Sequence, residues 1–62
     1  MRLGTVLKKY RSMVEKTTRQ MAGEIGISPA TYSRIERGEL MDAKTLVRIF
    51  IWLTGEEDPE NG

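Results

Sequence analysis

The sequence contains no cysteine and no histidine among its 62 residues. Without cysteine, neither a disulfide nor a thiolate metal site can support the core. Without histidine, the chain lacks the commonest general base and the commonest neutral metal ligand, and its serines have no evident activating base. The acidic residues Glu24, Glu36 and Glu39 show no spacing that indicates a catalytic pair. We therefore expect no enzymatic activity, no metal and no cofactor.

Long apolar runs are also missing. No stretch approaches the roughly 18 consecutive apolar residues that a membrane span requires, and the N-terminal residues do not resemble a secretory signal. These observations favour a cytoplasmic protein that does not contact a membrane. A chain this short forms a single domain with a small core, because such a domain buries only roughly 60% of its unfolded surface.

The net charge of +1 conceals an asymmetry along the chain. Residues 1–37 carry eight Lys and Arg against three acids, whereas residues 38–62 carry two against six. A basic front suits a polyanionic partner, although a solvated surface with a solubilising acidic tail gives the same pattern. We interpret residues 1–54 as the folded domain and residues 55–62 as an acidic, flexible tail.

Helix-start and helix-stop chemistry first occurs around residues 17–26. Thr17 followed by Gln20 is a capping box, in which each side chain bonds the other residue's backbone N–H. Gly26 is the residue type that adopts a left-handed C-cap without steric cost. The pattern predicts a helix over about residues 18–25.

A second start follows at once. Ser28 is a good N-cap, Pro29 suits the first helical position, and Gly38 provides the next stop. These signals predict a helix over about residues 29–37. Two short helices joined by a three-residue turn that contains glycine indicate a helix-turn-helix, whose second helix enters the DNA major groove.

Apolar spacing predicts the remaining core. The 3, 4, 3 spacing indicates a helix over about residues 2–15 with one buried face. In the next two helices and the turn between them, we expect a further set of side chains to point inward. The expected buried residues are Leu3, Val6, Leu7, Tyr10, Met13 and Val14, followed by Met21, Ala22, Ile25, Ile27, Tyr32 and Ile35.

The last helix is predicted to begin after Asp42, its N-cap, and to continue to about Leu53, with Gly55 ending it. Its expected core stripe is followed by further apolar residues that extend around the helix. Such a helix is normally covered on more than one side. We expect a self-association surface at Ile51 and Trp52; the alternative is that Trp52 folds back onto the helix over residues 2–15. The stripe is Leu46, Ile49, Phe50 and Leu53, and Val47 extends it.

These residues together resemble the Cro/repressor-type (XRE-like) helix-turn-helix DNA-binding domains of phage and bacterial regulators. The resemblance covers residues 3–53 and implies an all-α, compact, lambda-repressor-like domain of four or five helices, with the helix-turn-helix formed by the second and third. No single element of the motif is specific, but the joint spacing is. The matching segments are Leu3-Gly4, Leu7 and Arg11, Thr17 through Ala22, Gly26-Ile27-Ser28, and Ser33 through Gly38.

The resemblance also implies roles for individual residues. Arg11 and Glu36 should form a partly buried structural ion pair, and Thr18 and Arg19 should contact phosphate. Arg34 should read a base edge, because its planar fork matches the O6 and N7 atoms of guanine. The other residues expected at the DNA are Ser28, Pro29, Ala30, Thr31, Ser33 and Arg37, with Lys9 as a further candidate phosphate contact.

The sequence departs from the family pattern in three places. Glu15 and Lys16 stand where the family usually has a glycine and an aliphatic residue, so the first helix is expected to end differently. The loop after residue 38 is acidic at Glu39 and Asp42, whereas related loops are often basic and bind phosphate. The segment after residue 54 is too short and too polar to supply the fifth helix of many relatives.

The favoured function is a sequence-specific transcription regulator, of repressor or Cro type, that binds double-stranded DNA through residues 28–37. One domain offers few base contacts, so we expect a homodimer on an inverted repeat, with half-sites roughly one helical turn apart. The alternative is an antitoxin-like or other protein-interaction module that uses the apolar surface of the last helix to bind a protein partner.

Overall fold

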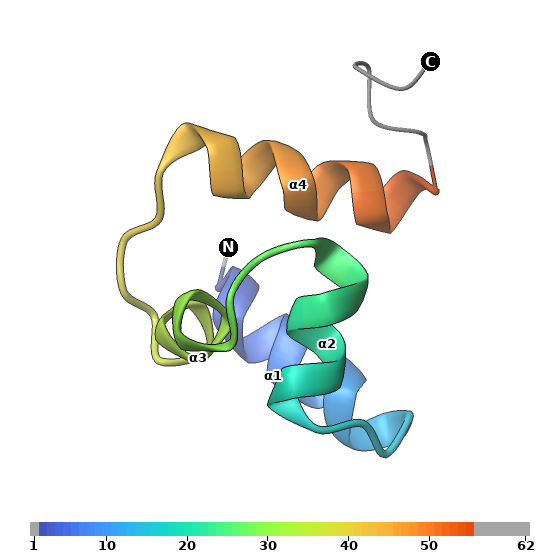
Figure 1. Ribbon diagram of the computed structural model, residues 1–62. Helices are drawn as coiled ribbons and strands as arrows, with labels where there is room; N and C mark the ends of the chain where they lie inside the picture. Colours follow the sequence, from blue (N-terminus) through green and yellow to red (C-terminus); the bar gives the residue numbers. More distant parts are fainter. Residues whose placement is uncertain (1, 56–62) are drawn as a thin grey trace.

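The computed structural model describes residues 2–55, which form four helices joined by short loops (Figure 1). The first helix ends two residues before the predicted boundary at residue 15, the third ends one residue before 37, and the last extends one residue beyond Leu53. Of the predicted tail 55–62, only Gly55 is described; it ends the last helix in a left-handed conformation. The helices are α1 (Leu3–Met13), α2 (Thr18–Ile25), α3 (Pro29–Glu36) and α4 (Ala43–Thr54).

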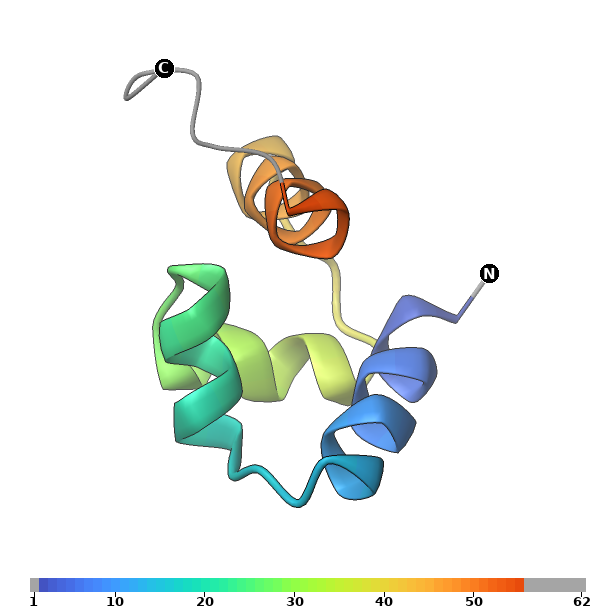
Figure 2. The same cartoon turned by 90° about the vertical axis from the view of Figure 1, so that its right-hand side faces the viewer.

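Helix α3 occupies the centre of the arrangement. It packs against both α1 and α2, and α4 packs across α2 (Figures 1 and 2). Figure 2 shows α3 running from the α2 side to the α1 side, with α4 above it in end-on view. Because α1 and α2 cover the inner side of α3, the outer side of α3 is left open to solvent.

The predicted helix starts are confirmed by side-chain caps. Thr17 forms a capping box: its hydroxyl accepts from the Gln20 backbone N–H at 3.1 Å, and its own N–H donates to the Gln20 side chain at 2.8 Å. The Ser28 hydroxyl caps α3 and the Asp42 carboxylate caps α4, each by accepting from the backbone N–H three residues on. These caps satisfy donors that a helix start leaves unpaired.

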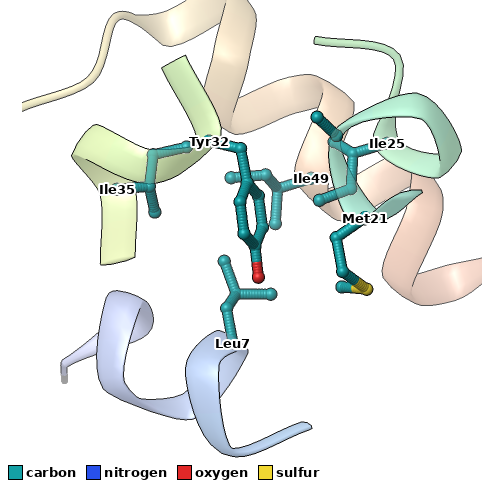
Figure 3. Close-up of a cluster of buried hydrophobic side chains, with 7 residues drawn as sticks. Leu7, Met21, Ile25, Tyr32, Ile35 and Ile49 are labelled. Atoms are coloured by element: carbon teal, nitrogen blue, oxygen red, sulfur yellow. The ribbon is translucent and has the colours of Figure 1, made fainter. Parts of the chain in front are cut away.

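A cluster of seven buried side chains joins all four helices (Figure 3). Tyr32 of α3 lies at its centre, with its hydroxyl directed toward Leu7 of α1 (Figure 3). That hydroxyl is buried with no hydrogen-bond partner within residues 2–55, and burial raises the pKa of Tyr32. The inward positions predicted for α2 and α3 are confirmed. The cluster comprises Leu7, Met21, Ala22, Ile25, Tyr32, Ile35 and Ile49, and Ile27 packs against it.

The predicted apolar face of α1 is only partly buried. Among the large side chains predicted to be buried, only Leu7 is; Leu3 packs against the cluster, while Val6 and Met13 are 54% and 82% exposed. Tyr10 and Val14 are exposed as well, which corrects their predicted burial. The physical reason is that α1 packs closely on a single helix, α3, which covers a narrow strip of its surface.

The predicted core stripe of α4 is also wrong except at Ile49. Phe50 and Leu53 remain 53% and 55% exposed, and Leu46 is exposed too. Trp52 instead points inward and packs on α1, as the alternative prediction stated. Its ring meets that of Tyr10 edge-on at 5.5 Å between centroids. Helix α4 therefore rests on the domain along the Ile49–Trp52 side and leaves an apolar stripe open.

The end of α1 takes an unusual conformation at Glu15. Its φ of +56° is the only positive φ at a residue other than glycine within residues 2–55. The Glu15 and Lys16 N–H groups donate to Ser12 O at 3.3 Å and Arg11 O at 3.1 Å, the two bonds of a Schellman motif. Helix α3 ends with the same pair of bonds, but there Gly38 occupies the left-handed position. The fold thus requires left-handed backbone where the chain lacks the usual glycine.

Replacing Glu15 with glycine is expected to stabilise the domain by about 0.5–1 kcal/mol, because glycine adopts positive φ without the steric cost that Glu15 bears. Thermal unfolding followed by circular dichroism would measure the change. Glu15→Ala removes the same charge but keeps the Cβ atom, so it should give no such gain. Equal melting temperatures for the glycine variant and the parent would contradict the assignment.

Candidate nucleic-acid interface

An ion pair anchors the end of α3 to α1. The Arg11 Nε and Nη2 atoms donate to the two carboxylate oxygens of Glu36 at 2.7 and 3.2 Å. Arg11 Nη1 also donates to the backbone oxygen of Lys16 at 3.2 Å, so one side chain ties both ends of the α1–α2 loop to α3. Burial of Glu36 opposes its ionisation, yet the bonds from Arg11 hold the pKa of that carboxyl below its usual range. The structural pair implied by the resemblance is therefore present.

A second ion pair links the α1–α2 loop to α2. The Lys16 ammonium group donates to the Glu24 carboxylate, and this bond lowers the pKa of Glu24 and raises that of Lys16. Both side chains are about one-third exposed, so water screens the pair and its stabilising effect is small. Lys16 thus links the α1–α2 loop to α2 and does not lie on the outer face of α3.

The outer face of α3 gathers most of the predicted DNA contacts. Ala30, Arg34 and Arg37 are exposed on the side of α3 away from Tyr32, and Ser28 and Pro29 are exposed at its start. Thr31 and Ser33 are half-buried at its edges. The Arg34 side chain forms no hydrogen bond or ion pair with any residue of the described part of the chain, and its five donors therefore point into solvent.

Arg37 has a different environment from Arg34. Its Nε donates to a Glu39 carboxylate oxygen at 2.9 Å, and both side chains are more than half exposed. The acidic loop after α3 thus holds one of the cations predicted to bind phosphate. The sequence analysis assigned Arg37 to the DNA surface and Glu39 to the acidic loop, but it did not predict the ion pair between them.

Replacing Glu39 with glutamine is expected to raise DNA affinity about three-fold at low salt, because it releases Arg37 and removes a negative charge beside the duplex. Fluorescence anisotropy with a labelled duplex at two salt concentrations would measure it. Glu39→Gln should raise affinity clearly less when it is added to Arg37→Gln than when it is added to the parent, because only the removal of the charge then remains. A gain of the same size in both backgrounds would show that the ion pair is irrelevant.

The start of α2 and one face of α1 carry the remaining predicted phosphate contacts. Thr18 is half-buried and Arg19 is exposed in the first turn of α2, where backbone N–H groups and the helix dipole favour an anion. Lys9 is exposed on α1. The structure therefore leaves these side chains accessible, with Arg19 in the position best suited to a phosphate.

A polar hollow of about 260 Å³ lies between the helix-turn-helix and α4. Lys44 and Arg48 contribute its cations, and sequence analysis assigned neither a role. The signal that could have found them is their i, i+4 spacing, which places both on one face of α4. Its lining residues are Gly26, Ile27, Ser28, Thr31, Lys44, Thr45 and Arg48.

Other kinds of site are not indicated in the part of the chain that the structure describes. Residues 2–55 contain no group of three acidic side chains placed to hold a metal ion. None of α1 to α4 has the length and apolar character needed to cross a membrane.

Two capped helices joined at Gly26, with the second exposed along a basic face, define a helix-turn-helix DNA-binding domain. A family model described as a helix-turn-helix domain matches residues 2–60, nearly the whole chain. The chain therefore belongs to the helix-turn-helix domain family. No curated protein and no solved structure matches it.

Proposed function

We propose that this protein is a sequence-specific regulator of transcription, of the repressor or Cro type, that reads the major groove through residues 28–37. The observation that carries the proposal is the accessible Arg34 at the centre of the outer face of α3. Family membership supports DNA binding, whereas the repressor or Cro type and an origin in a bacterium or its phage follow from the resemblance alone. Such a protein would act in the cytoplasm.

In this proposal some side chains contact bases and others contact phosphate. Arg34 donates two hydrogen bonds from its guanidinium group to a guanine, while the apolar surfaces of Pro29 and Ala30 contact a thymine methyl group. Thr18 and Arg19 bind phosphate at the start of α2. The residues that flank the base contacts on α3 are Ser28, Thr31, Ser33 and Arg37. Phosphate contacts position the domain without reading sequence, so specificity depends mainly on Arg34.

We further propose that two copies associate through α4. The exposed side chains of Leu46, Val47, Phe50 and Leu53 form a stripe along this helix. We therefore centre the proposed self-association surface on Phe50 and not on Ile51 and Trp52, as the sequence predicted. Trp52 already packs within its own chain, and Ile51 is half-buried. A homodimer would place two copies of α3 on an inverted repeat.

The dimer is tested by comparing affinity for one half-site with affinity for a palindrome in a gel-shift assay. We expect clearly tighter binding to the palindrome, and we expect Phe50→Gln to abolish the difference. Met13→Gln is the control, because Met13 is an exposed apolar residue of α1 that is not part of the stripe. Equal affinity of the parent for both duplexes would count against the dimer.

A protein-interaction module, such as an antitoxin, is the second candidate. The fully exposed Leu40 within the acidic loop favours it, because an apolar side chain between carboxylates suits a protein better than phosphate. Salt separates the two functions. Phosphate binding releases counterions, so DNA affinity should fall steeply as salt rises. Absence of such a slope on any duplex would favour the protein-interaction module.

A further inference from the structure

We propose that Lys44 and Arg48 of α4 form a second phosphate-binding group, which engages the DNA backbone beside the start of α3. The inference rests on the proposed DNA-binding function and deepens it. It assigns a role to the polar hollow between the helix-turn-helix and α4. It also explains how the domain can hold DNA although its α3–α4 loop is acidic.

The hollow brings cations and hydroxyl groups together. Lys44 and Arg48 lie one helical turn apart on α4, and the Arg48 side chain passes 3.9 Å from the position of a Cβ atom on Gly26. Ser28 and Thr31 line the same space, and the Ser28 hydroxyl donates to the Thr31 hydroxyl at 2.8 Å. Among the lining residues in the described part of the chain, none carries a carboxylate. Ammonium, guanidinium and hydroxyl donors are the groups that bind phosphate oxygens.

The position of the hollow suits a duplex. It adjoins Ser28, which begins the proposed recognition surface, and it lies at the Gly26 end of α2. Thr18 and Arg19 lie at the other end of this eight-residue helix, which at 1.5 Å per residue is about 12 Å long. The major groove is also about 12 Å wide. The two ends of α2 are therefore about one groove width apart, as groups that contact the backbone on either side of the groove would need to be.

The acidic neighbour of the hollow is already engaged. The Asp42 carboxylate accepts from the Thr45 N–H at 2.8 Å. Hydrogen bonding from the side chain and then the backbone of Thr45, with a contribution from the charge of Lys44, lowers the pKa of Asp42. Asp42 therefore acts as the helix cap beside the hollow and is not one of its lining residues. Within residues 2–55, the carboxylate beside the hollow is therefore already bonded at the start of α4.

The experiment measures affinity for a random-sequence 30-base-pair duplex by fluorescence anisotropy at several salt concentrations. The Lys44→Gln/Arg48→Gln variant is compared with Arg2→Gln/Lys8→Gln, which changes the net charge equally at exposed residues outside the proposed interface. We expect the first variant to lower the slope of log affinity against log salt by about 1.8, since each lost phosphate contact removes about 0.9. Affinity at about 0.1 M salt should fall at least tenfold, and the control should change the slope by less than half as much.

A third variant, Lys44→Gln, guards against disturbance of the fold, because Lys44 is exposed whereas Arg48 is half-buried. It should lower the slope by about 0.9 while circular dichroism shows an unchanged helix content. Slopes that match the control would overturn the phosphate-binding group and leave the proposed function standing, provided that the parent binds DNA. Failure of the parent to bind any duplex would overturn both.

Discussion

Replacing Gly4 with alanine is expected to destabilise the domain by about 3 kcal/mol and to lower its melting temperature by roughly 15 °C. A Cβ atom on Gly4 would lie 2.0 Å from the carbonyl oxygen of Ile35, well inside van der Waals contact. The obstructing atom belongs to the backbone of α3, so it cannot move aside as a flexible side chain would. Helix α1 would have to shift away from α3, which would also disturb the nearby pair of Arg11 and Glu36.

Gly23→Ala provides the matched control for this prediction. Gly23 lies exposed within α2, and a Cβ atom there would meet nothing within 4 Å. Alanine is the better helix former, so this variant should be more stable by about 0.5–1 kcal/mol. Thermal and urea unfolding would measure both variants. Similar effects of the two substitutions would mean that the close approach of α1 and α3 does not determine the packing.

Replacing Arg11 with methionine is the second change with a large expected effect. It leaves the Glu36 carboxylate, whose side chain is only 9% exposed, without its bidentate partner. Removing one member of a buried pair is costly because the remaining charge is stranded. The Lys16 carbonyl would lose its bond from Arg11 as well. We expect the melting temperature at pH 7 to fall by about 10 °C or more.

The pH dependence distinguishes a stranded charge from lost packing. In the parent the pKa of Glu36 is lowered by folding, so its contribution to stability is complete above its unfolded pKa and is lost as pH falls through the folded value. In Arg11→Met the carboxylate has no partner, and its protonation relieves the penalty. Burial raises the pKa of the stranded carboxyl, so the difference in melting temperature between parent and variant should begin to narrow above the unfolded glutamate pKa of about 4.3 and should continue to narrow as pH falls below it. A difference that stays constant down to pH 3 would contradict this explanation.

Local chemistry explains why the helix-turn-helix could be predicted in detail. The caps at Thr17, Ser28 and Asp42 and the stop at Gly26 depend on residues within one turn of one another, and such signals can be read directly from the sequence. The Arg11–Glu36 pair joins residues 25 positions apart, so it followed only from the family resemblance. The left-handed conformation of Glu15 could likewise not be predicted from its residue type, because that conformation favours glycine.

Burial along α1 and α4 was predicted less well, for a physical reason. Periodicity indicates which side of a helix is apolar, but it does not indicate how much of that side a neighbouring helix covers. Helix α1 packs mainly on α3 and α4 mainly on α2, so Met13 and Phe50 are exposed although their spacing is that of core residues. The hollow beside Lys44 arises from the packing of α4 against the turn, which spacing within one helix cannot indicate.

Selection of bound sites from a random pool of duplex DNA tests the central claim most directly. The parent should enrich a defined sequence that contains guanine, arranged as an inverted repeat. Arg34→Ala should lose the preference at that guanine, which a good bidentate contact supports by about 1–3 kcal/mol, while it keeps the salt-dependent affinity for the DNA backbone. An unchanged preference in Arg34→Ala would contradict the assignment of α3 as the reading helix through Arg34.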